Sequence, residues 1–244
     1  MSDLRIFAAP RDAAGQCAAQ ILKYLGDSPR STLAISGGSS PRAMFEIFAT
    51  TAFDWSRVHL FWVDERCVPP TDAQSNFKLA NDTWLAPAKF PIANIHRVQT
   101  ERDFNDAAEI YAEELSLVFG EGVPKFDVIH RGMGPDAHTA SLFPGEPLID
   151  DRTGLAAAVF VEKLNSHRVT LLPAVLLAAK HTVMLVTGAD KAQPLADVLY
   201  GQHDPKQFPC QLAERDGCDV AWFLDPPAAA KIDAAKIDAA KIRK

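Results

Sequence analysis

The chain has 244 residues, of which 48% are hydrophobic and 23% are charged. These values are typical of a soluble globular protein and exclude a disordered chain, a collagen and a disulfide-stapled miniprotein. The 25 Lys and Arg residues against 31 Asp and Glu residues give a net charge of −6. This balance argues against a broad nucleic-acid-binding surface but leaves room for a local basic pocket that holds a small anion.

The cysteine pattern and the hydropathy favour a cytoplasmic protein that has no contact with a membrane. No two cysteines form a C-x-x-C pair, so we expect reduced thiols rather than disulfides or a redox motif. The first residues, MSDLRIFAAPRD, do not resemble a secretory signal. The chain also contains no run of about 18 apolar residues that could cross a membrane. The cysteines are Cys17, Cys67, Cys210 and Cys218.

Short apolar runs alternate with helical patterns along the chain. The runs are rich in β-branched and aromatic residues and are apolar on both faces, which is typical of strands covered on both sides of a parallel sheet. The predicted strands are Thr32–Ser36, Val58–Asp64, Phe126–His130, Ala157–Val161, Thr182–Thr187 and Asp219–Leu224.

The segments between these strands carry the apolar spacing of helices. One helix has its apolar face at Ala14, Cys17, Ala18, Ile21 and Leu25 and is closed by Gly26. Asp103 is placed to cap a helix that starts at Phe104, and Pro41 opens a third helix. Further helices are predicted over 74–85, 173–180 and 190–200. This alternation predicts an α/β fold, a three-layer sandwich with a mainly parallel sheet.

The C-terminal residues have a different composition. Residues 228–244 read AAAKIDAAKIDAAKIRK, a five-residue repeat that does not keep its isoleucines on one face of a helix. We expect a solvated helical or frayed tail without chemistry, in which Asp233 and Lys236 can pair at i, i+3. The chain would then consist of one catalytic domain over 1–227 and the tail over 228–244.

The loops after the predicted strands are where ligands bind in such sheets. The first strand ends in Gly37-Gly38 before a helix, an arrangement in which a helix N-terminus can receive an anion. The second strand ends in Asp64-Glu65-Arg66. This cluster is either a solvated strand end or, with Asp64 and Arg66, part of a ligand crevice.

The third strand leads into a loop shaped by Gly132, Gly134 and Pro135. Asp136 and His138 follow in this loop, and a histidine beside a carboxylate can act as a general base near neutral pH. The remaining histidines show no metal-ligand spacing, so we predict no metal site. Lys191 lies in the turn after a later strand, where it can face a phosphate.

Together these loops resemble the signature segments of the 6-phosphogluconolactonase family, which is grouped with the glucosamine-6-phosphate isomerases and deaminases. The resemblance implies a Rossmann-like α/β/α fold and the hydrolysis of 6-phospho-D-glucono-1,5-lactone to 6-phospho-D-gluconate in the pentose phosphate pathway, without a cofactor. The resemblance covers roughly residues 5–225, and its segments are SGGSSPR (36–42), WVDERCVPPTDAQSNF (62–77), GMGPDAHTASLFPG (132–145), RVTLL (168–172) and TGADKA (187–192).

The resemblance also assigns roles to individual residues. His138 would be the base that activates water, and Asp136 would orient it. The other candidates would hold the substrate, chiefly by its phosphate. They are Gly37, Gly38, Ser39, Arg66 and Lys191, with Arg168 as a further candidate.

Two positions depart from the family pattern. The family usually has glycine where Ala137 stands, and apolar residues where His130 and Arg131 precede Gly132. We expect Ala137 to keep a negative φ, because a methyl group is easier to accommodate than the left-handed conformation.

Two other functions remain open. An aminosugar-phosphate isomerase or deaminase would carry a Glu five residues after the histidine, where this chain has Phe143. A sugar-phosphate-binding regulator would need the phosphate turn but not the pair of Asp136 and His138. The sequence leaves the oligomeric state open.

Overall fold

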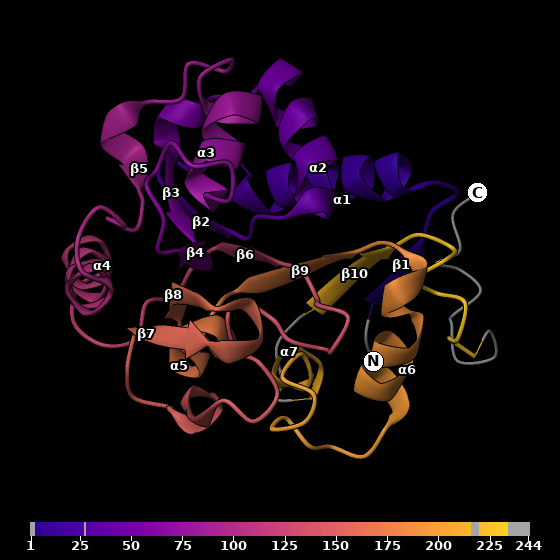
Figure 1. Cartoon of the computed structure of the whole chain (residues 1–244). Helices are drawn as coiled ribbons and strands as arrows, with labels where there is room; N and C mark the ends of the chain where they lie inside the picture. Colours follow the sequence, from indigo (N-terminus) through magenta and orange to yellow (C-terminus); the bar gives the residue numbers. More distant parts are fainter. Residues whose placement is uncertain (1–2, 27, 216–219, 234–244) are drawn as a thin grey trace.

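A parallel β-sheet forms the centre of the molecule (Figure 1). We describe the protein from a computed structural model that covers residues 3–26, 28–215 and 220–233. Within this part of the chain the sheet has seven strands in the order β1-β10-β9-β6-β2-β3-β5. They are β1 (Asp3–Ile6), β2 (Ser31–Ile35), β3 (Val58–Trp62), β5 (Ile95–His96), β6 (Val128–Arg131), β9 (His181–Val186) and β10 (Val220–Leu224).

Helices cover both faces of this sheet, as the sequence predicts (Figure 1). Alternate side chains of a strand enter different cores, because successive side chains of a strand point to opposite faces. Leu33 and Ile35 pack beneath α1 and α2, whereas Ala34 between them packs on the side of α4. The helices are α1 (Pro10–Leu25), α2 (Ser39–Thr50), α3 (Asn76–Ala80), α4 (Phe104–Phe119), α5 (Pro173–Leu177), α6 (Ala192–Tyr200) and α7 (Gln211–Arg215). The three-layer α/β/α sandwich is therefore confirmed.

Several helix ends follow the sequence signals. Gly26 closes α1 with positive φ, and the Asp103 carboxylate caps α4 by accepting a hydrogen bond from the Asn105 N–H at 3.0 Å. The predicted start of α2 is two residues late, because this helix begins at Ser39. The segment 74–85 is helical as α3 followed by a π-helical turn over Asn81–Leu85, whereas α5 is shorter than predicted.

A second, three-stranded antiparallel sheet was not predicted. Its order is β4-β8-β7, formed by β4 (Asp64–Arg66), β7 (Ala156–Val161) and β8 (Ser166–Leu171). The prediction of a strand in the β7 region is confirmed, but its placement in the parallel sheet is wrong. The predicted strand Val58–Asp64 is divided at Val63, so that Asp64 enters the small sheet. This division carries the charged residues after β3 away from the main sheet and beside β8.

The beginning of the Ala-rich tail is solvated only in part, since Ala230, Lys231 and Asp233 are exposed but two of its residues are not. Ala228 is fully buried and Ile232 is 9% exposed, and both pack in a cluster with Leu4 and Trp222. The prediction of a solvated tail is wrong for these two residues. Lys236 and the rest of residues 234–244 lie outside the described residues, so the predicted pair with Asp233 and the domain boundary at residue 227 stay predictions.

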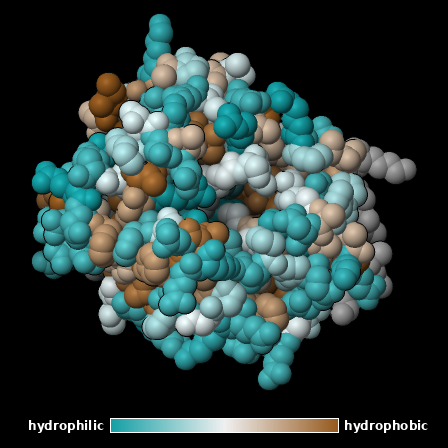
Figure 2. Space-filling view, viewed as in Figure 1, coloured by the Kyte–Doolittle hydropathy of each residue, from teal (hydrophilic) through white to brown (hydrophobic). Residues whose placement is uncertain are grey.

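The described residues contain no helix that is both long and apolar enough to span a membrane. In the space-filling view, hydrophilic side chains cover most of the visible face, and a hollow bordered by hydrophilic and near-neutral residues opens near its middle (Figure 2).

Candidate active site

The candidate site is a pocket at the carboxyl ends of the central strands. The chain runs from β2 to β3 in one direction across the sheet and from β6 to β9 in the other, so the pocket lies where the strand order reverses. The cavity measures about 210 Å³. Its walls come from segments far apart in the sequence, and they include Gly37, Gly38, Ser39, Asp64, Arg66, Asn76, Gly134, His138, Arg168 and Lys191.

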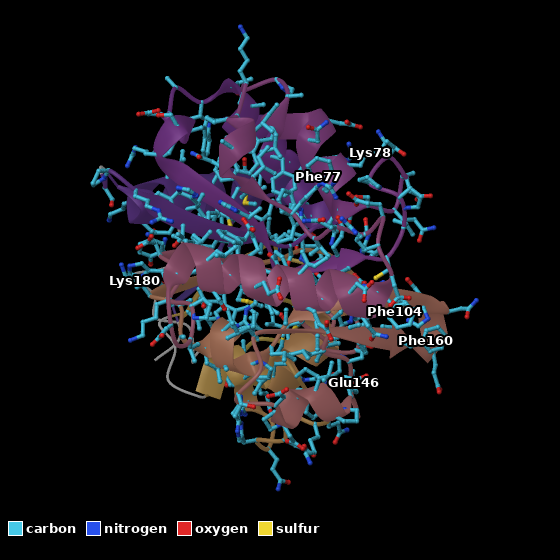
Figure 3. The ribbon with its side chains drawn as sticks, turned by 90° about the vertical axis from the view of Figure 1, so that its left-hand side faces the viewer. Phe77, Lys78, Phe104, Glu146, Phe160 and Lys180 are labelled. Atoms are coloured by element: carbon cyan, nitrogen blue, oxygen red, sulfur yellow. The ribbon has the colours of Figure 1, made fainter. Side chains whose placement is uncertain are left out.

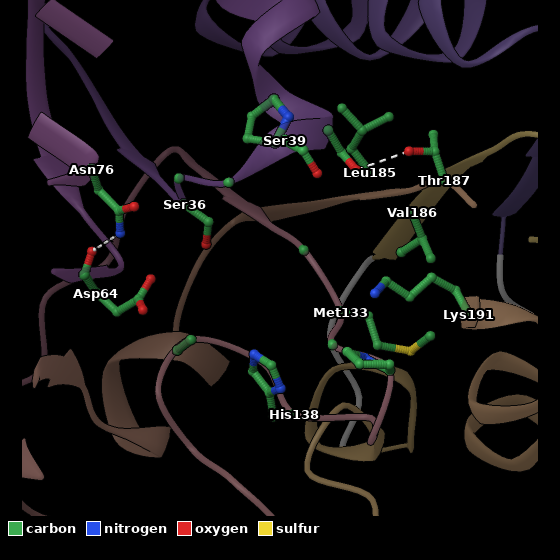
Figure 4. Close-up of a pocket in the computed structure, with 18 of the residues that line it drawn as sticks. Ser36, Ser39, Asp64, Asn76, Met133, His138, Leu185, Val186, Thr187 and Lys191 are labelled. Atoms are coloured by element: carbon green, nitrogen blue, oxygen red, sulfur yellow. Dashed lines mark hydrogen bonds between the residues drawn. The ribbon is translucent and has the colours of Figure 1, made fainter. Parts of the chain in front are cut away.

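The glycine turn after β2 forms one wall of the pocket. Gly38 has a φ of 115°, which favours glycine, and α2 begins directly after it, so the first N–H groups of this helix lie beside the cavity. Gly37 is required for space, because a Cβ there would overlap the side chain of Asn76. The hydroxyl groups of Ser40 and Thr187 hydrogen-bond at 2.8 Å and join this turn to the end of β9 (Figure 4). The structure thus places the glycine turn and the start of α2 at the pocket wall, and the binding of an anion there stays a prediction.

The three charges after β3 have different surroundings. Asp64 and Arg66 line the pocket, whereas the Glu65 carboxylate accepts hydrogen bonds from the backbone N–H groups of Asn76 and Phe77 at 2.7 Å and 2.6 Å. Burial raises the pKa of Glu65 although these hydrogen bonds lower it. Asp64 and Glu65 are 6% and 1% exposed, so the interpretation as a solvated strand end is wrong.

Asn76 is a pocket residue that sequence reasoning did not single out. Its Nδ2 donates a hydrogen bond to the backbone oxygen of Asp64 at 2.8 Å (Figure 4). Its side chain therefore lies between the glycine turn and the end of β3. The signal in the sequence was the polar run Gln74-Ser75-Asn76 before a helix, which does not distinguish a helix cap from a ligand contact.

His138 and Asp136 form a hydrogen-bonded pair in the loop after β6. His138 Nδ1 lies 2.5 Å from Asp136 Oδ1. With the proton on Nδ1, the imidazole donates to the carboxylate and leaves Nε2 as a free acceptor. Figure 4 shows this ring directed into the space between Asp64 and Lys191. Gly134 makes room for the pair, because a Cβ at this position would overlap the His138 ring.

The surroundings of His138 keep its imidazole neutral. Burial is the largest cause that lowers the pKa of His138, and together with the charges of Arg168, Lys191 and Arg66 it brings this pKa to about 4 against the opposing charge of Asp64. At neutral pH the ring is therefore unprotonated and able to accept a proton, which is what a general base requires. Asp136 lies behind the ring, at the edge of a second hollow rather than in the pocket itself.

Ala137 has a φ of 62°, so the expectation of a negative φ is wrong. Hydrogen bonds on both sides impose this conformation. The Ala137 N–H donates to the Gly134 oxygen at 3.1 Å, the Gly134 N–H donates to the His138 oxygen at 2.8 Å, and the Cys210 N–H donates to the Ala137 oxygen at 2.9 Å. A left-handed conformation at a residue other than glycine costs about 1–2 kcal/mol, and this backbone strain lies next to His138.

Two arginines approach the pocket from neighbouring strands of the small sheet. Arg66 and Arg168 are directly opposite in the register of β4 and β8, an arrangement that destabilises the sheet unless negative charge lies nearby. Arg168 Nη1 lies 3.8 Å from Asp64 Oδ2. Among the described residues, the Nε of each arginine is buried without a hydrogen-bond partner. Lys191, which forms an ion pair with Asp190 at 2.7 Å, adds a third cation to the pocket wall.

Ser141 and Phe143 restrict the chemistry of the site. The buried Ser141 hydroxyl donates to Asp64 Oδ2 at 2.7 Å, so it is not paired with His138 as a serine nucleophile would be. The Phe143 ring stacks on the His138 ring at 4.1 Å between centroids. No group of three His, Cys, Asp or Glu side chains suited to a metal ion occurs in the described part of the chain.

The two residues before Gly132 are fully buried in β6. The imidazole nitrogens of His130 have no hydrogen-bond partner among the described residues, and burial lowers the pKa of this ring to about 3. The departure from the family pattern therefore lies inside the sheet and adds no group to the pocket wall.

Known proteins are similar to this chain in both sequence and fold. A family model described as glucosamine-6-phosphate isomerases/6-phosphogluconolactonase matches residues 8–222. The chain is 33% identical over 217 residues to the 6-phosphogluconolactonase of a Synechocystis strain, covering 87% of this chain and 89% of that protein. It is 38% identical over 192 residues to the 6-phosphogluconolactonase of Treponema pallidum, covering 76% and 80%.

Solved structures agree with these matches. A crystal structure of 6-phosphogluconolactonase from Thermotoga maritima superposes with a TM-score of 0.81 at 26% identity, covering 92% of this chain and all of that chain. A monomeric glucosamine-6-phosphate deaminase superposes with the same TM-score at 16% identity and shares the fold alone. The chain therefore belongs to the glucosamine-6-phosphate isomerase/6-phosphogluconolactonase family.

Proposed function

We infer that the protein is a 6-phosphogluconolactonase, which hydrolyses 6-phospho-D-glucono-1,5-lactone to 6-phospho-D-gluconate in the pentose phosphate pathway. The observation that carries this inference is the pair of His138 and Asp136, in which His138 lines a cation-lined pocket and is not paired with the nearby Ser141 hydroxyl. Two curated relatives that this chain matches over most of their length are named 6-phosphogluconolactonase.

In this proposal His138 Nε2 accepts a proton from a water molecule as the water oxygen attacks the lactone carbonyl. Asp136 holds the Nδ1–H and stabilises the imidazolium that forms. The tetrahedral intermediate collapses as the C1 bond to the ring oxygen breaks, and His138 returns the proton to that oxygen. A lactone carbonyl is already electrophilic, so a base, a placed water and positive charge near the oxyanion are sufficient.

The phosphate of the substrate would lie against the turn of Gly37, Gly38 and Ser39, near Arg66 and Lys191, with Arg168 as a further cation. A phosphate accepts hydrogen bonds from helix N-terminal N–H groups and from cationic side chains. Because it is remote from C1, its binding energy can fix the sugar ring so that water approaches the carbonyl. The cavity of about 210 Å³ is smaller than the pockets of about 300–1,000 Å³ that hold drug-sized ligands, which suits a single sugar phosphate.

The alternative within the family is an aminosugar-phosphate deaminase. Phe143 argues against it, because a phenyl ring stacked on His138 cannot transfer a proton. A regulator that binds sugar phosphates would not require the neutral, carboxylate-linked histidine.

The deciding experiment supplies freshly made lactone and subtracts its spontaneous hydrolysis. Enzyme-dependent formation of 6-phosphogluconate is expected, with no ammonia released from glucosamine 6-phosphate. Ligand binding without turnover would favour the regulator, and ammonia release would favour the deaminase.

A further inference from the structure

The hairpin between β7 and β8 brings a lysine to the outer side of the His138–Asp136 pair. The tip of this hairpin is a 3₁₀ turn over Glu162–Leu164, and Asn165 reverses the chain with a φ of 46°. From this tip Lys163 Nζ forms an ion pair with Asp136 Oδ2, while Asp136 Oδ1 faces His138. The two oxygens of one carboxylate therefore have different partners on opposite sides.

Lys163 also contacts the aromatic ring that covers His138. Its Nζ lies 4.4 Å from the centroid of the Phe143 ring, a cation–π distance, and this ring stacks on the imidazole. Both contacts lie outside the substrate pocket. They border a second hollow on the outer surface, lined in part by Phe143, Glu146, Phe160 and Lys163.

We propose that Lys163 is a positioning residue, which holds the Asp136 carboxylate in line with His138 Nδ1 from the outer hollow. The inference rests on the proposed role of His138 as the base. A carboxylate turns readily about its terminal torsion, and Asp136 belongs to a loop. A charge-assisted hydrogen bond to the far oxygen restricts this rotation, so that the near oxygen keeps the imidazole in its Nδ1-protonated form.

The lysine has an electrostatic effect as well. Its charge offsets that of Asp136 and so opposes protonation of His138. Removing it leaves Asp136 charged beside the ring, so His138 should become easier to protonate. The other charged groups that face His138 stay unchanged in this comparison, and they are Asp64 and Arg66 of β4, Arg168 of β8 and Lys191 after β9.

The test compares Lys163→Met, which removes the charge but keeps a side chain of similar length, with Lys163→Arg, which keeps the charge. The matched control is Lys180→Met, because Lys180 forms a similar ion pair with Asp127 at 2.7 Å and is 63% exposed, against 51% for Lys163. Lys180 lies on the opposite side of the molecule from Phe160 of β7 (Figure 3). The pH profiles of lactone hydrolysis are measured for all four proteins.

We expect Lys163→Met to lower kcat about tenfold, because the base is misaligned, and to change KM less than about twofold. The acid limb of kcat/KM should move to higher pH by about half a unit, the effect of removing one nearby positive charge under nearly full solvent screening. Lys163→Arg should restore most of kcat and the position of the limb, and Lys180→Met should match the wild type. If Lys163→Met kept the wild-type kcat and the wild-type acid limb of kcat/KM, the inference would be overturned. A rise in KM without a change in kcat would overturn it too.

A second measurement does not depend on the substrate. The ¹⁵N shifts of His138 in the ligand-free protein report which ring nitrogen carries the proton. The wild type should be Nδ1-protonated, and Lys163→Met should show a mixture of tautomers. If the wild type fails to hydrolyse the lactone, the proposed function fails, and the tautomers still decide whether Lys163 positions Asp136. An unchanged tautomer in Lys163→Met would then contradict the inference.

Discussion

Charged side chains at the two ends of the parallel sheet differ in how completely they are paired. At the amino end, the Asp127 carboxylate before β6 accepts hydrogen bonds from the Thr32 N–H at 2.8 Å, the Thr32 hydroxyl at 3.0 Å and Lys180 Nζ at 2.7 Å. At the carboxyl end, Arg66 and Arg168 face each other across two strands with buried Nε groups that lack partners among the described residues.

The difference separates charges that are fully paired within the fold from charges that are paired only in part. A carboxylate that receives three hydrogen bonds at the amino end is complete without any other molecule. At the carboxyl end, Arg168 pairs with Asp64 at 3.8 Å and Arg66 Nη1 donates to the Gln74 oxygen at 2.6 Å, but the Nε of each stays without a partner among the described residues. Substitutions at the amino end should therefore change stability, whereas those at the carboxyl end should change turnover and binding.

The largest expected effect is that of His138→Ala. Loss of the general base should lower lactone turnover by about 10²–10⁴-fold while the protein stays folded. Turnover is measured against the spontaneous rate, and circular dichroism checks the fold. Near wild-type turnover in a folded variant would remove His138 from the mechanism.

The next effect concerns the phosphate. Lys191→Ala should weaken binding of 6-phosphogluconate by about 10–100-fold, the value of a hydrogen bond to a charged group. Binding of unphosphorylated gluconate should change much less. Calorimetry with both ligands makes the comparison, and equal losses for the two would argue against a phosphate contact.

At the amino end, Asp127→Ala should reduce the free energy of unfolding by about 1–3 kcal/mol, because it leaves partly buried donors unpaired. Lactone turnover should not change. Burial raises the pKa of Asp127, but Lys180 and Thr32 outweigh this effect and lower it below the ordinary 3.8. The stabilisation is therefore present above about pH 4 and is lost as the pH falls through the lowered pKa. Urea unfolding at pH 7 and pH 3 would show the difference, which should shrink at the lower pH.

The smallest effect is at Ala137. Ala137→Gly relieves a left-handed conformation but removes a buried methyl group, so the two terms oppose each other. Ala34→Gly is the control, because Ala34 is equally buried and lies in a regular strand. We expect Ala137→Gly to be less destabilising than Ala34→Gly by about 1 kcal/mol in urea unfolding. An equal loss would show that the φ of 62° carries no strain.

Most of the parallel sheet is predictable from the sequence, whereas the pairing of the small sheet is not. The apolar runs at β2 and β9 are buried on both faces, and this burial produces their pattern. The run at β7 is compatible with either sheet, and β8 begins with Ser-His-Arg, which alternates weakly. The pairing of Arg66 with Arg168 is a matter of register between distant segments, and local patterns do not encode it.

The loop that holds His138 is likewise only partly predictable from the sequence. The sequence identifies Asp136 and His138 because a polar pair in a Gly- and Pro-rich loop is unusual. It does not reveal the φ of Ala137, because this angle is set by three backbone hydrogen bonds, donated by Ala137 to Gly134, by Gly134 to His138 and by Cys210 to Ala137. The contact between Lys163 and Asp136 is likewise tertiary, since the two residues lie on separate elements.

Gly134 has a consequence for how this site can diversify. Every other amino acid would add a Cβ that overlaps the imidazole of His138 and crowds the carboxylate of Asp136. Laboratory evolution that randomises this position should therefore return only glycine among active clones. New substrate preferences would have to arise from neighbouring walls that tolerate side chains, so libraries are better directed there than at the loop that shapes the base.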